Sequence, residues 1–456
     1  MRAGDMDCMK TNKFRLNLTY TRIIALSFFG LIIAGSVLLA LPAAARSMES
    51  TPYINSLFTA VSATCVTGLV TYDTFTHWSL FGQIVILCLI QIGGLGFMTL
   101  VTLLAMFLGK NIGLHERRLL MQSAGTLQIG GVVRLLRRIA MGTALFEGIG
   151  AVLLAIRFCP KMGFFEGVYN AVFHSVSAFC NAGFDLMGQY KPSSSFTLMY
   201  DDVIVNITLM CLIILGGLGF IVWNDILTYR GQLRKYKLHS KIVIMITAIL
   251  VLGGAVLFFL FEYNHSLSQM ALPDKILAAF FGAVTPRTAG FNTVDITQMS
   301  DSGSLLTMVL MLIGGSPGST AGGIKTTTFA VLVIGAVASA RQNRAINVWK
   351  RRLEEDVIRR ASAIFIVYLT GIVISTMLIC AMQELHLKDV LFETISAAGT
   401  VGLSAGITPL LNPVSKILIM ILMYGGRVGG LSLALALAER REHVPVERPV
   451  EKILIG

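Results

Sequence analysis

Charged side chains are scarce in this chain. Asp, Glu, Lys and Arg make up 14% of its 456 residues, whereas apolar residues make up 55%. Soluble globular domains carry about 25% charged residues, which cover their surfaces. The composition therefore excludes an ordinary soluble domain. Long uncharged stretches indicate membrane spans instead, since a helix needs about 20 apolar residues to cross a bilayer.

Paired cysteines and a secretory leader are also missing. The seven cysteines form no C-x-x-C pair, and most lie in apolar runs, where cysteine acts as a small hydrophobic residue. We expect neither a disulfide framework nor a thiolate metal site. Residues 1–21 are polar and basic and lack the short apolar region and cleavage site of a signal peptide, so we expect no cleaved leader.

The apolar runs that are present predict eight membrane spans. Five runs contain no charged residue, and three contain one each: Glu147, Lys325 and Arg427. A soluble protein with eight such helices would need polar faces to cover them, and these runs have none. The predicted spans are 23–44, 78–109, 139–156, 203–224, 242–261, 302–340, 361–383 and 417–438.

Basic residues outnumber acidic ones by 37 to 25, and most of them lie in alternate loops. They gather before the first span, after the second, fourth and sixth spans, and in the C-terminal tail. If each span crosses once, the positive-inside rule places these segments and both termini in the cytoplasm. The charge is therefore a topology signal and predicts no nucleic acid partner. The same loops offer contacts for membrane lipids or an acidic partner.

A short segment with one fixed glycine occurs four times, at intervals of about 110 residues. Each copy has Leu or Phe after the glycine and Phe ten residues before it, and repeats of this kind decide the architecture of a chain. The copies are residues 62–69 (SATCVTGL), 177–184 (SAFCNAGF), 284–291 (VTPRTAGF) and 396–403 (SAAGTVGL), and the preceding phenylalanines are Phe58, Phe173, Phe280 and Phe392.

Each quarter of the chain has the same plan: a span, an apolar half-helix too short to cross, the glycine, and a second span. Irregular backbone at membrane depth is tolerated where it is buried in protein or lines a wet cavity. We therefore predict an all-α polytopic membrane protein with four parallel helix–pore half-helix–helix repeats around a central pore, with pseudo-fourfold symmetry. The predicted division is a cytoplasmic N-terminal segment 1–21, repeats 22–110, 134–230, 240–341 and 358–438, and a cytoplasmic tail 439–456.

The second span of each quarter contains clustered glycines. Clusters at 92–97, 215–220 and 424–430 are typical of close helix packing in membranes. The third quarter differs, because residues 314–325 read GGSPGSTAGGIK. Five glycines and a proline do not maintain a helix, so we predict two half-helices joined by an unwound loop near the middle of the membrane.

The fixed glycines indicate an ion filter. Glycine takes positive φ without strain, so consecutive carbonyl oxygens can face one axis and replace the hydration shell of a monovalent cation. Each half-helix also ends at its glycine segment with the negative end of its dipole. The predicted filter residues are Val66, Thr67, Gly68, Asn181, Ala182, Gly183, Thr288, Ala289, Gly290, Thr400, Val401 and Gly402. Asp73, Asp185 and Asp295 follow the first three glycines and either concentrate cations outside the filter or are ordinary loop charges.

The fourfold plan, the CNAGF and RTAGF segments and the broken third return helix resemble the Trk/Ktr/HKT superfamily of potassium transporters, and most closely the membrane subunits of bacterial Ktr systems. The resemblance covers roughly residues 15 to 456. It implies potassium uptake across the bacterial cytoplasmic membrane, K+ held by filter carbonyls, Na+ as a coupling or activating ion and no organic cofactor. It further implies a homodimer and a cytosolic KtrA-type ring that binds nucleotide.

The same resemblance implies a gate below the filter, and the unwound loop is the natural candidate because a regulated pore needs a segment with two arrangements. The predicted gate residues are Gly314, Gly315, Ser316, Pro317, Gly318, Ser319, Thr320, Ala321, Gly322, Gly323, Lys325 and Arg427. Lys325 either lies near the inner cavity or extends to the cytoplasmic interface. Arg427 offers a donor to the loop carbonyls, and Glu147 receives no role.

Two other functions were weighed. Gly314 to Gly318 fits the G-x-S-x-G pattern of a serine hydrolase, but no strand precedes Ser316 and no histidine lies at its depth. Residues 318–326 fail as a P-loop because Ile324 stands where glycine is required. A carrier with alternating access remains the nearer alternative, since carriers also use repeats and broken helices. We predict a transport protein and not an enzyme.

Overall fold

The computed structural model describes residues 20–96, 132–342, 346–349 and 351–429. Almost every described element is a helix, and the one sheet is a short hairpin. The predicted N-terminal segment up to residue 19, the end of the first repeat and the basic loop after it, the end of the fourth repeat and the tail 439–456 lie outside the described residues.

Four long helices form the first span of each predicted quarter. Among the described residues, four helices are long and apolar enough to cross a membrane, and a bent pair makes a fifth candidate. Many of their large apolar side chains, such as Phe29, Leu252 and Met377, are exposed, as expected of a surface in contact with lipid. The long helices are α1 (Tyr20–Ala40), α7 (Val132–Met162), α11 (Leu238–Glu262) and α15 (Glu355–Met382).

A short helix follows each long one and runs back toward the centre of the molecule. These helices are 13 to 16 residues long, too short to cross a bilayer. The repeated phenylalanine anchors three of them, since Phe58, Phe173 and Phe392 are fully buried, whereas in the third copy the neighbouring Phe281 is buried instead. The four half-helices are α2 (Tyr53–Cys65), α8 (Phe164–Phe179), α12 (Leu272–Val284) and α16 (Leu387–Gly399).

One return helix is bent where the sequence predicts a continuous span. A continuous span over 203–224 is wrong, because α9 and α10 meet at an angle of 96° at Gly219. Gly219 takes φ +92°, and the next amide, on Phe220, donates to the carbonyl of Gly318 at 2.8 Å in the third quarter. A glycine can turn there at little cost, so the helix breaks where a distant segment accepts its amide.

The other return helices also stop at glycines or at the loop. Gly96 and Gly429 follow α4 and α17 with φ +84° and +95°. In the third quarter two helices are separated by the non-helical residues 313–325, the segment for which the sequence predicts an unwound loop. The return helices are α4 (Leu80–Leu95), α9 (Val203–Leu218) with α10 (Phe220–Tyr229), α13 (Asp301–Leu312) with α14 (Thr326–Ala340), and α17 (Pro413–Val428).

The clustered glycines confirm the expected close packing and show what they pack against. A Cβ atom at Gly93, Gly216 or Gly426 would strike the backbone carbonyl of Thr64, Phe179 or Ala398 respectively. Each of these carbonyls lies at the end of a half-helix. The return helices therefore support the half-helix ends through direct backbone contact, for which only glycine leaves room.

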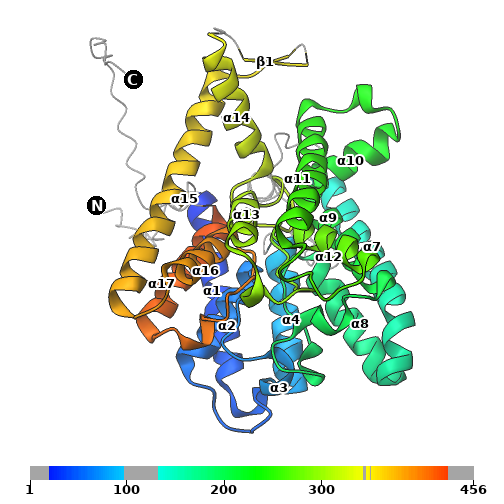
Figure 1. The fold of residues 1–456 in the computed structure, drawn as a ribbon, viewed down its shortest axis with the longest axis vertical. Coiled ribbons are helices and arrows are strands. Elements are labelled where there is room, and N and C mark those ends of the chain that lie inside the picture. Colours follow the sequence, from blue (N-terminus) through cyan, green and yellow to red (C-terminus); the bar gives the residue numbers. More distant parts are fainter. Residues whose placement is uncertain (1–19, 97–131, 343–345, 350, 430–456) are drawn as a thin grey trace, which may run out of the picture.

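In Figure 1, α16 and α17 lie on one side of the molecule and α7 and α8 lie on the other. The short α3 (Thr74–His77) lies at one end of the molecule, and β1 and α10 lie at the other. Strand β1 (Asn347–Val348) pairs antiparallel with β2 (Arg351–Arg352). The 3-10 turns are η1 (Pro42–Ala44), η2 (Met187–Gln189), η3 (Ser195–Met199), η4 (Leu233–Lys235), η5 (Ile296–Gln298) and η6 (Thr408–Leu410).

Candidate functional site

The four repeated segments share one backbone conformation. In each, the glycine has positive φ: +95° at Gly68, +70° at Gly183, +80° at Gly290 and +91° at Gly402. The residue two places earlier is left-handed in every copy, although it is not glycine: Val66, Asn181, Thr288 and Thr400. Such residues seldom take positive φ, so the same unusual turn in all four copies indicates a shared requirement of the site.

The four glycines lie against one another in a closed ring. A Cβ atom on each would meet the carbonyl oxygen of the residue before the next glycine in the chain, and the last meets the first. The pairs are Gly68 with Ala182 (2.6 Å), Gly183 with Ala289 (2.7 Å), Gly290 with Val401 (2.6 Å) and Gly402 with Thr67. No side chain fits at any of the four positions, so the ring consists of backbone alone.

Hydroxyl side chains at the ends of the half-helices hold these turns, a role that was not predicted from the sequence. The amides of Gly68 and Gly402 each donate to a serine hydroxyl at 3.1 Å, on Ser62 and Ser396. The hydroxyls of Ser177 and Thr285 donate to the carbonyls after their glycines, at 2.7 and 2.6 Å. The signal was a hydroxyl residue five or six places before every glycine.

The ring forms the floor of a cavity of about 240 Å³, which we call the vestibule. All four glycines line it, together with the loops that follow them. Two of the three expected aspartates reach it: Asp73 and Asp185 line the cavity. Asp295 does not line it, because its carboxylate caps η5 through the amide and hydroxyl of Thr297. The position of Asp295 therefore agrees with an ordinary loop charge.

The two vestibule aspartates differ in setting. Asp73 accepts hydrogen bonds from the amides of Phe75, Thr76 and Ser193. Burial, and secondly the charge of Asp73, raise the pKa of Asp185 to about 7, although an amide and a hydroxyl of this loop partly oppose the shift. The vestibule therefore carries a carboxyl group that titrates near neutral pH.

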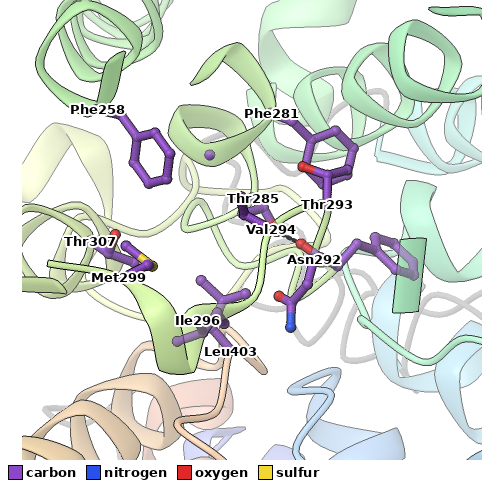
Figure 2. Close-up of a pocket in the computed structure, with 12 residues that line it drawn as sticks. Phe258, Phe281, Thr285, Asn292, Thr293, Val294, Ile296, Met299, Thr307 and Leu403 are labelled. Atoms are coloured by element: carbon purple, nitrogen blue, oxygen red, sulfur yellow. Dashed lines mark hydrogen bonds between the residues drawn. The ribbon is translucent and has the colours of Figure 1, made fainter. Parts of the chain in front are cut away.

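Side chains also join neighbouring glycine segments to one another. The side-chain amide of Asn181 donates to the carbonyl of Arg287 and to the hydroxyl of Thr288, both at 3.2 Å. The guanidinium of Arg287 is buried and donates to Thr247 on α11 at 3.1 Å. Beside the third segment lies an apolar pocket of about 20 Å³ (Figure 2), with Leu403 of the fourth segment at its edge. Its size admits at most a single water.

The loop 313–325 packs directly beneath the ring. The Thr320 hydroxyl donates to the carbonyl of Phe179, which ends the second half-helix, at 3.0 Å. A Cβ atom on Gly322 would strike Thr400 of the fourth glycine segment. The amides of Ser316 and Thr320 donate to Gly217 and Gly216 of α9, at 3.0 and 3.3 Å. The loop thus connects the second and fourth quarters across the centre.

Arg427 ties three elements together. Its guanidinium donates to the carbonyl of Thr320 in the loop and to the carbonyls of Gly93 and Gly94 at the end of α4, the last at 2.9 Å. The expected donation from Arg427 to a loop carbonyl is present. Because Arg427 belongs to α17, this one side chain holds the loop against both α17 and α4.

The two other lone charges have local partners. The ammonium of Lys325 donates to the carbonyls of Ala321 and Gly322, at 2.7 and 3.3 Å, so it folds back on its own loop and does not extend to an interface. Glu147 accepts from the side-chain amide of Gln91 at 3.2 Å and lies beside Cys180, next to the second glycine segment. Ser316 bonds the Thr326 hydroxyl at 3.0 Å, with no histidine among its described partners.

The apolar helices and the ring of backbone between them are typical of membrane transport proteins. The chain matches the family described as "TrkH: Cation transport protein" over residues 28–444, and it belongs to this family. The chain is a potassium or cation uptake transporter of the Trk/Ktr family. This family consists of transporters and not of enzymes, so the hydrolase interpretation of Ser316 falls.

Relatives match over nearly their whole length. The chain is 40% identical to the potassium/sodium uptake protein NtpJ of Enterococcus hirae, over 99% of this chain and 100% of that protein. It is 38% identical to the Ktr system potassium uptake protein B of Bacillus subtilis (97% and 98%) and 39% identical to that of Vibrio alginolyticus (95% and 94%). The fold resembles the crystal structure of the potassium transporter TrkH from Vibrio parahaemolyticus, with TM-score 0.71, 21% identity and coverage of 93% and 86%.

Proposed function

We propose that the chain takes up potassium through a gated cation pore whose selectivity filter is the ring of four glycine segments. The closed ring of backbone contacts between Gly68, Gly183, Gly290 and Gly402 is the observation that carries the proposal. Carbonyl oxygens around such an axis replace the water shell of K+. Val66, Asn181, Thr288 and Thr400 and the residues between them and the glycines supply the remaining filter carbonyls.

The architecture that we propose is four parallel repeats with pseudo-fourfold symmetry around this axis. Two features support it: the half-helices α2, α8, α12 and α16 precede equivalent turns, and the four turns follow chain order around the ring. The C-terminal ends of the half-helices direct negative dipole ends below the ring, which favours a cation there. The division into repeats 22–110, 134–230, 240–341 and 358–438 follows from this plan.

We propose that the vestibule opens to the outside of a bacterial cytoplasmic membrane and that both termini lie in the cytoplasm. The distribution of Lys and Arg supports this orientation. Asp73 and Asp185 are then on the outer side of the filter, where carboxylates raise the local concentration of cations. The loop 313–325 lies on the cytoplasmic side of the ring.

The loop 313–325, with Arg427, is the proposed gate. It lies beneath the ring and is held by bonds to α9, to α4 through Arg427, and to α17 through Gly426, which accepts from Gly323 at 3.2 Å. These are hydrogen bonds that one movement of the loop breaks together. A segment with two such arrangements allows the pore to close below a fixed filter.

Partners of the pore are also part of the proposal. The names of the relatives support a second protein component and a role for sodium. Two relatives belong to a Ktr system, and one is called a potassium/sodium uptake protein. We infer a homodimer, a cytosolic KtrA-type nucleotide-binding ring on the basic face, and Na+ as a coupling or activating ion. No organic cofactor is needed for conduction.

Reconstitution in liposomes tests the function. Liposomes loaded with K+ are diluted into K+-free buffer, and uptake of labelled rubidium is followed with K+ or Na+ as competitor. A pore gives uptake driven by the membrane potential, which external K+ abolishes at far lower concentration than Na+. Obligatory one-for-one exchange without response to potential would instead favour a carrier with alternating access, and equal competition by K+ and Na+ would refute potassium selectivity.

A further inference from the structure

One position in each half-helix lies nine residues before the filter glycine. In two of the four copies, the side chain at this position bonds the loop that follows the glycine. These positions hold Thr59, His174, Phe281 and Glu393. His174 and Glu393 are almost completely buried, at 0% and 1% exposure. In the ring, the second and fourth segments each lie between the first and third. The two polar buried residues therefore belong to opposite sides of the pore.

His174 joins its half-helix to the vestibule wall. Its Nδ1 donates to the carbonyl of Asn170 at 2.7 Å, so Nε2 is free to accept, and the amide of Leu186 donates to it at 3.0 Å. Leu186 lies three residues after Gly183 and directly follows Asp185, which lines the vestibule. The histidine thus fixes the backbone at one side of the filter mouth.

Glu393 makes the equivalent connection on the opposite side. Its Oε1 accepts from the hydroxyl of Ser404 at 3.2 Å and from that of Thr408, and both residues line the vestibule. The backbone amide of Ala405 is a further donor, and Ala405 lies three residues after Gly402, the same offset as Leu186 from Gly183. Two chemically different side chains therefore hold the same point of two repeats.

The other two copies lack this connection. The Thr59 hydroxyl donates to the carbonyl of Asn55 within its own helix, at 3.0 Å. Phe281 is apolar and lines the small pocket with Phe258 and Met299 (Figure 2). The bonds from His174 and Glu393 to the mouth are therefore a specific feature of two opposite segments and not a general property of the position.

We propose that His174 and Glu393 are positioning residues that fix the outer mouth of the filter and thereby set its affinity for K+ and its discrimination against Na+. The proposal rests on the filter function proposed above. Without the buried acceptor, the amide of Leu186 or Ala405 loses its partner, so the loop must shift to find another. The hydroxyls of Ser404 and Thr408 keep their mutual contact at 3.2 Å but lose the carboxylate. A shift of a few tenths of an ångström at the glycine alters a site built from backbone oxygens.

The test compares substitutions that remove or retain the acceptor. His174→Leu and Glu393→Leu remove it, whereas His174→Gln and Glu393→Gln retain an acceptor oxygen at similar reach. Matched controls at the same offset are Thr59→Val and Phe281→Leu. The readouts are the K+ concentration that half-saturates uptake in liposomes and the ratio of K+ to Na+ competition, with protein mass and yield as a check on folding.

The leucine variants are expected to raise the half-saturating K+ concentration about tenfold, as for loss of one buried hydrogen bond to the site, and to lower the K+/Na+ ratio. The glutamine variants are expected to stay near the intact protein, and so are both controls. Leucine variants that match the controls in affinity and selectivity would overturn the proposal.

Ser404→Ala and Thr408→Val keep the test decisive if a leucine variant does not fold. Each removes one donor to Glu393 from the vestibule side and is expected to shift selectivity in the same direction by a smaller amount. Intact selectivity in both would also overturn the proposal. Gly290→Ser distinguishes failure of the proposed filter from failure of the positioning role. If it changes selectivity while the leucine variants do not, the filter is supported and the positioning role alone is wrong.

Discussion

At the scale of single residues, the site depends on side chains around the backbone ring as well as on the ring itself. Asp185 is the group whose behaviour is easiest to measure, since burial and the charge of Asp73 raise its pKa to about 7. The Met187 amide and the Ser195 hydroxyl also face it. As pH falls from 8 to 6 its carboxylate becomes mostly protonated, and the vestibule loses a negative charge.

We therefore predict that the half-saturating K+ concentration rises about two- to threefold between pH 8 and pH 6, and that Asp185→Asn removes this dependence. Asp295→Asn, whose carboxylate caps η5, is the matched control and should behave as the intact protein. The pKa of Asp185 is raised from the ordinary value of 3.8 to about 7 in the folded protein, so its ionisation between these pH values disfavours the folded state. Acidification through this group therefore does not destabilise the fold. A pH dependence that survives in Asp185→Asn would contradict the prediction.

The sequence predicted the glycines but not their supports. The four-times repeated spacing identified Gly68, Gly183, Gly290 and Gly402 because a backbone requirement repeats with the fold. The roles of His174 and Glu393 depend on where the following loop returns, and a pattern along the chain does not contain that distance. Asp185 and Asp295 look alike in sequence for the same reason, although only Asp185 faces the vestibule.

At the scale of elements, the loop 313–325 is the part of the molecule that the gate hypothesis requires to move. Its two ends are neighbours: the amide of Gly314 donates to the carbonyl of Ile324 at 2.9 Å. A Cβ atom on Gly314 would lie 3.3 Å from the Cα of Gly323. The two ends of the loop are therefore about as close to each other as adjacent residues, whose Cα atoms lie about 3.8 Å apart. The loop can be shortened without pulling α13 and α14 together.

Deletion of residues 315–322 is predicted to raise the initial rate of rubidium uptake several-fold and to make it independent of any cytosolic partner. The reason is that the segment beneath the ring is removed while the ring itself remains. Uptake is measured in liposomes at matched protein content. A deletion variant that folds and conducts no faster than the intact protein would show that the loop is not the gate.

Arg427→Ala is predicted to change uptake in the same direction, but less. The substitution removes the donor that holds Thr320 to Gly93 and Gly94, whereas the bonds of the loop to α9 remain. Arg427→Lys keeps the charge but has no fork of donors to bond both partners at once. It should resemble Arg427→Ala in uptake rate, so an intact rate in the lysine variant would argue that charge alone matters.

Element boundaries were predicted least well where two quarters meet. The half-helix α2 and the loop after α13 follow from local composition, since a largely apolar stretch of 13 residues is too short to cross and glycine with proline breaks a helix. The bend at Gly219 does not follow, because its cluster resembles those that merely pack. The bend depends on the Gly318 carbonyl, which lies in a different quarter of the chain and accepts a hydrogen bond from the Phe220 amide.

At the scale of the whole molecule, orientation in the membrane is a separate claim from the filter. Single cysteines in a cysteine-free background test it with a reagent that does not cross membranes. Ser47 lies on the exposed loop before α2, and Gly231 lies on the exposed turn after α10. Ser47→Cys should be labelled from outside intact cells and Gly231→Cys only after lysis. The reverse pattern would invert the proposed topology and place the vestibule aspartates in the cytoplasm.

Four segments that lie far apart in the sequence are proposed to form one potassium-selective ring. The most direct measurement is the K+/Na+ competition ratio for rubidium uptake in the four variants Gly68→Ser, Gly183→Ser, Gly290→Ser and Gly402→Ser, each in liposomes. Gly253→Ser is the control, since Gly253 lies within α11 and a Cβ there meets nothing within 4 Å.

Each ring variant places a Cβ atom against a carbonyl of the neighbouring segment at positive φ, so all four should lose K+ discrimination while the control keeps it. If folded ring variants retain the K+/Na+ ratio of the intact protein, the ring of glycines is not the filter and the account is wrong.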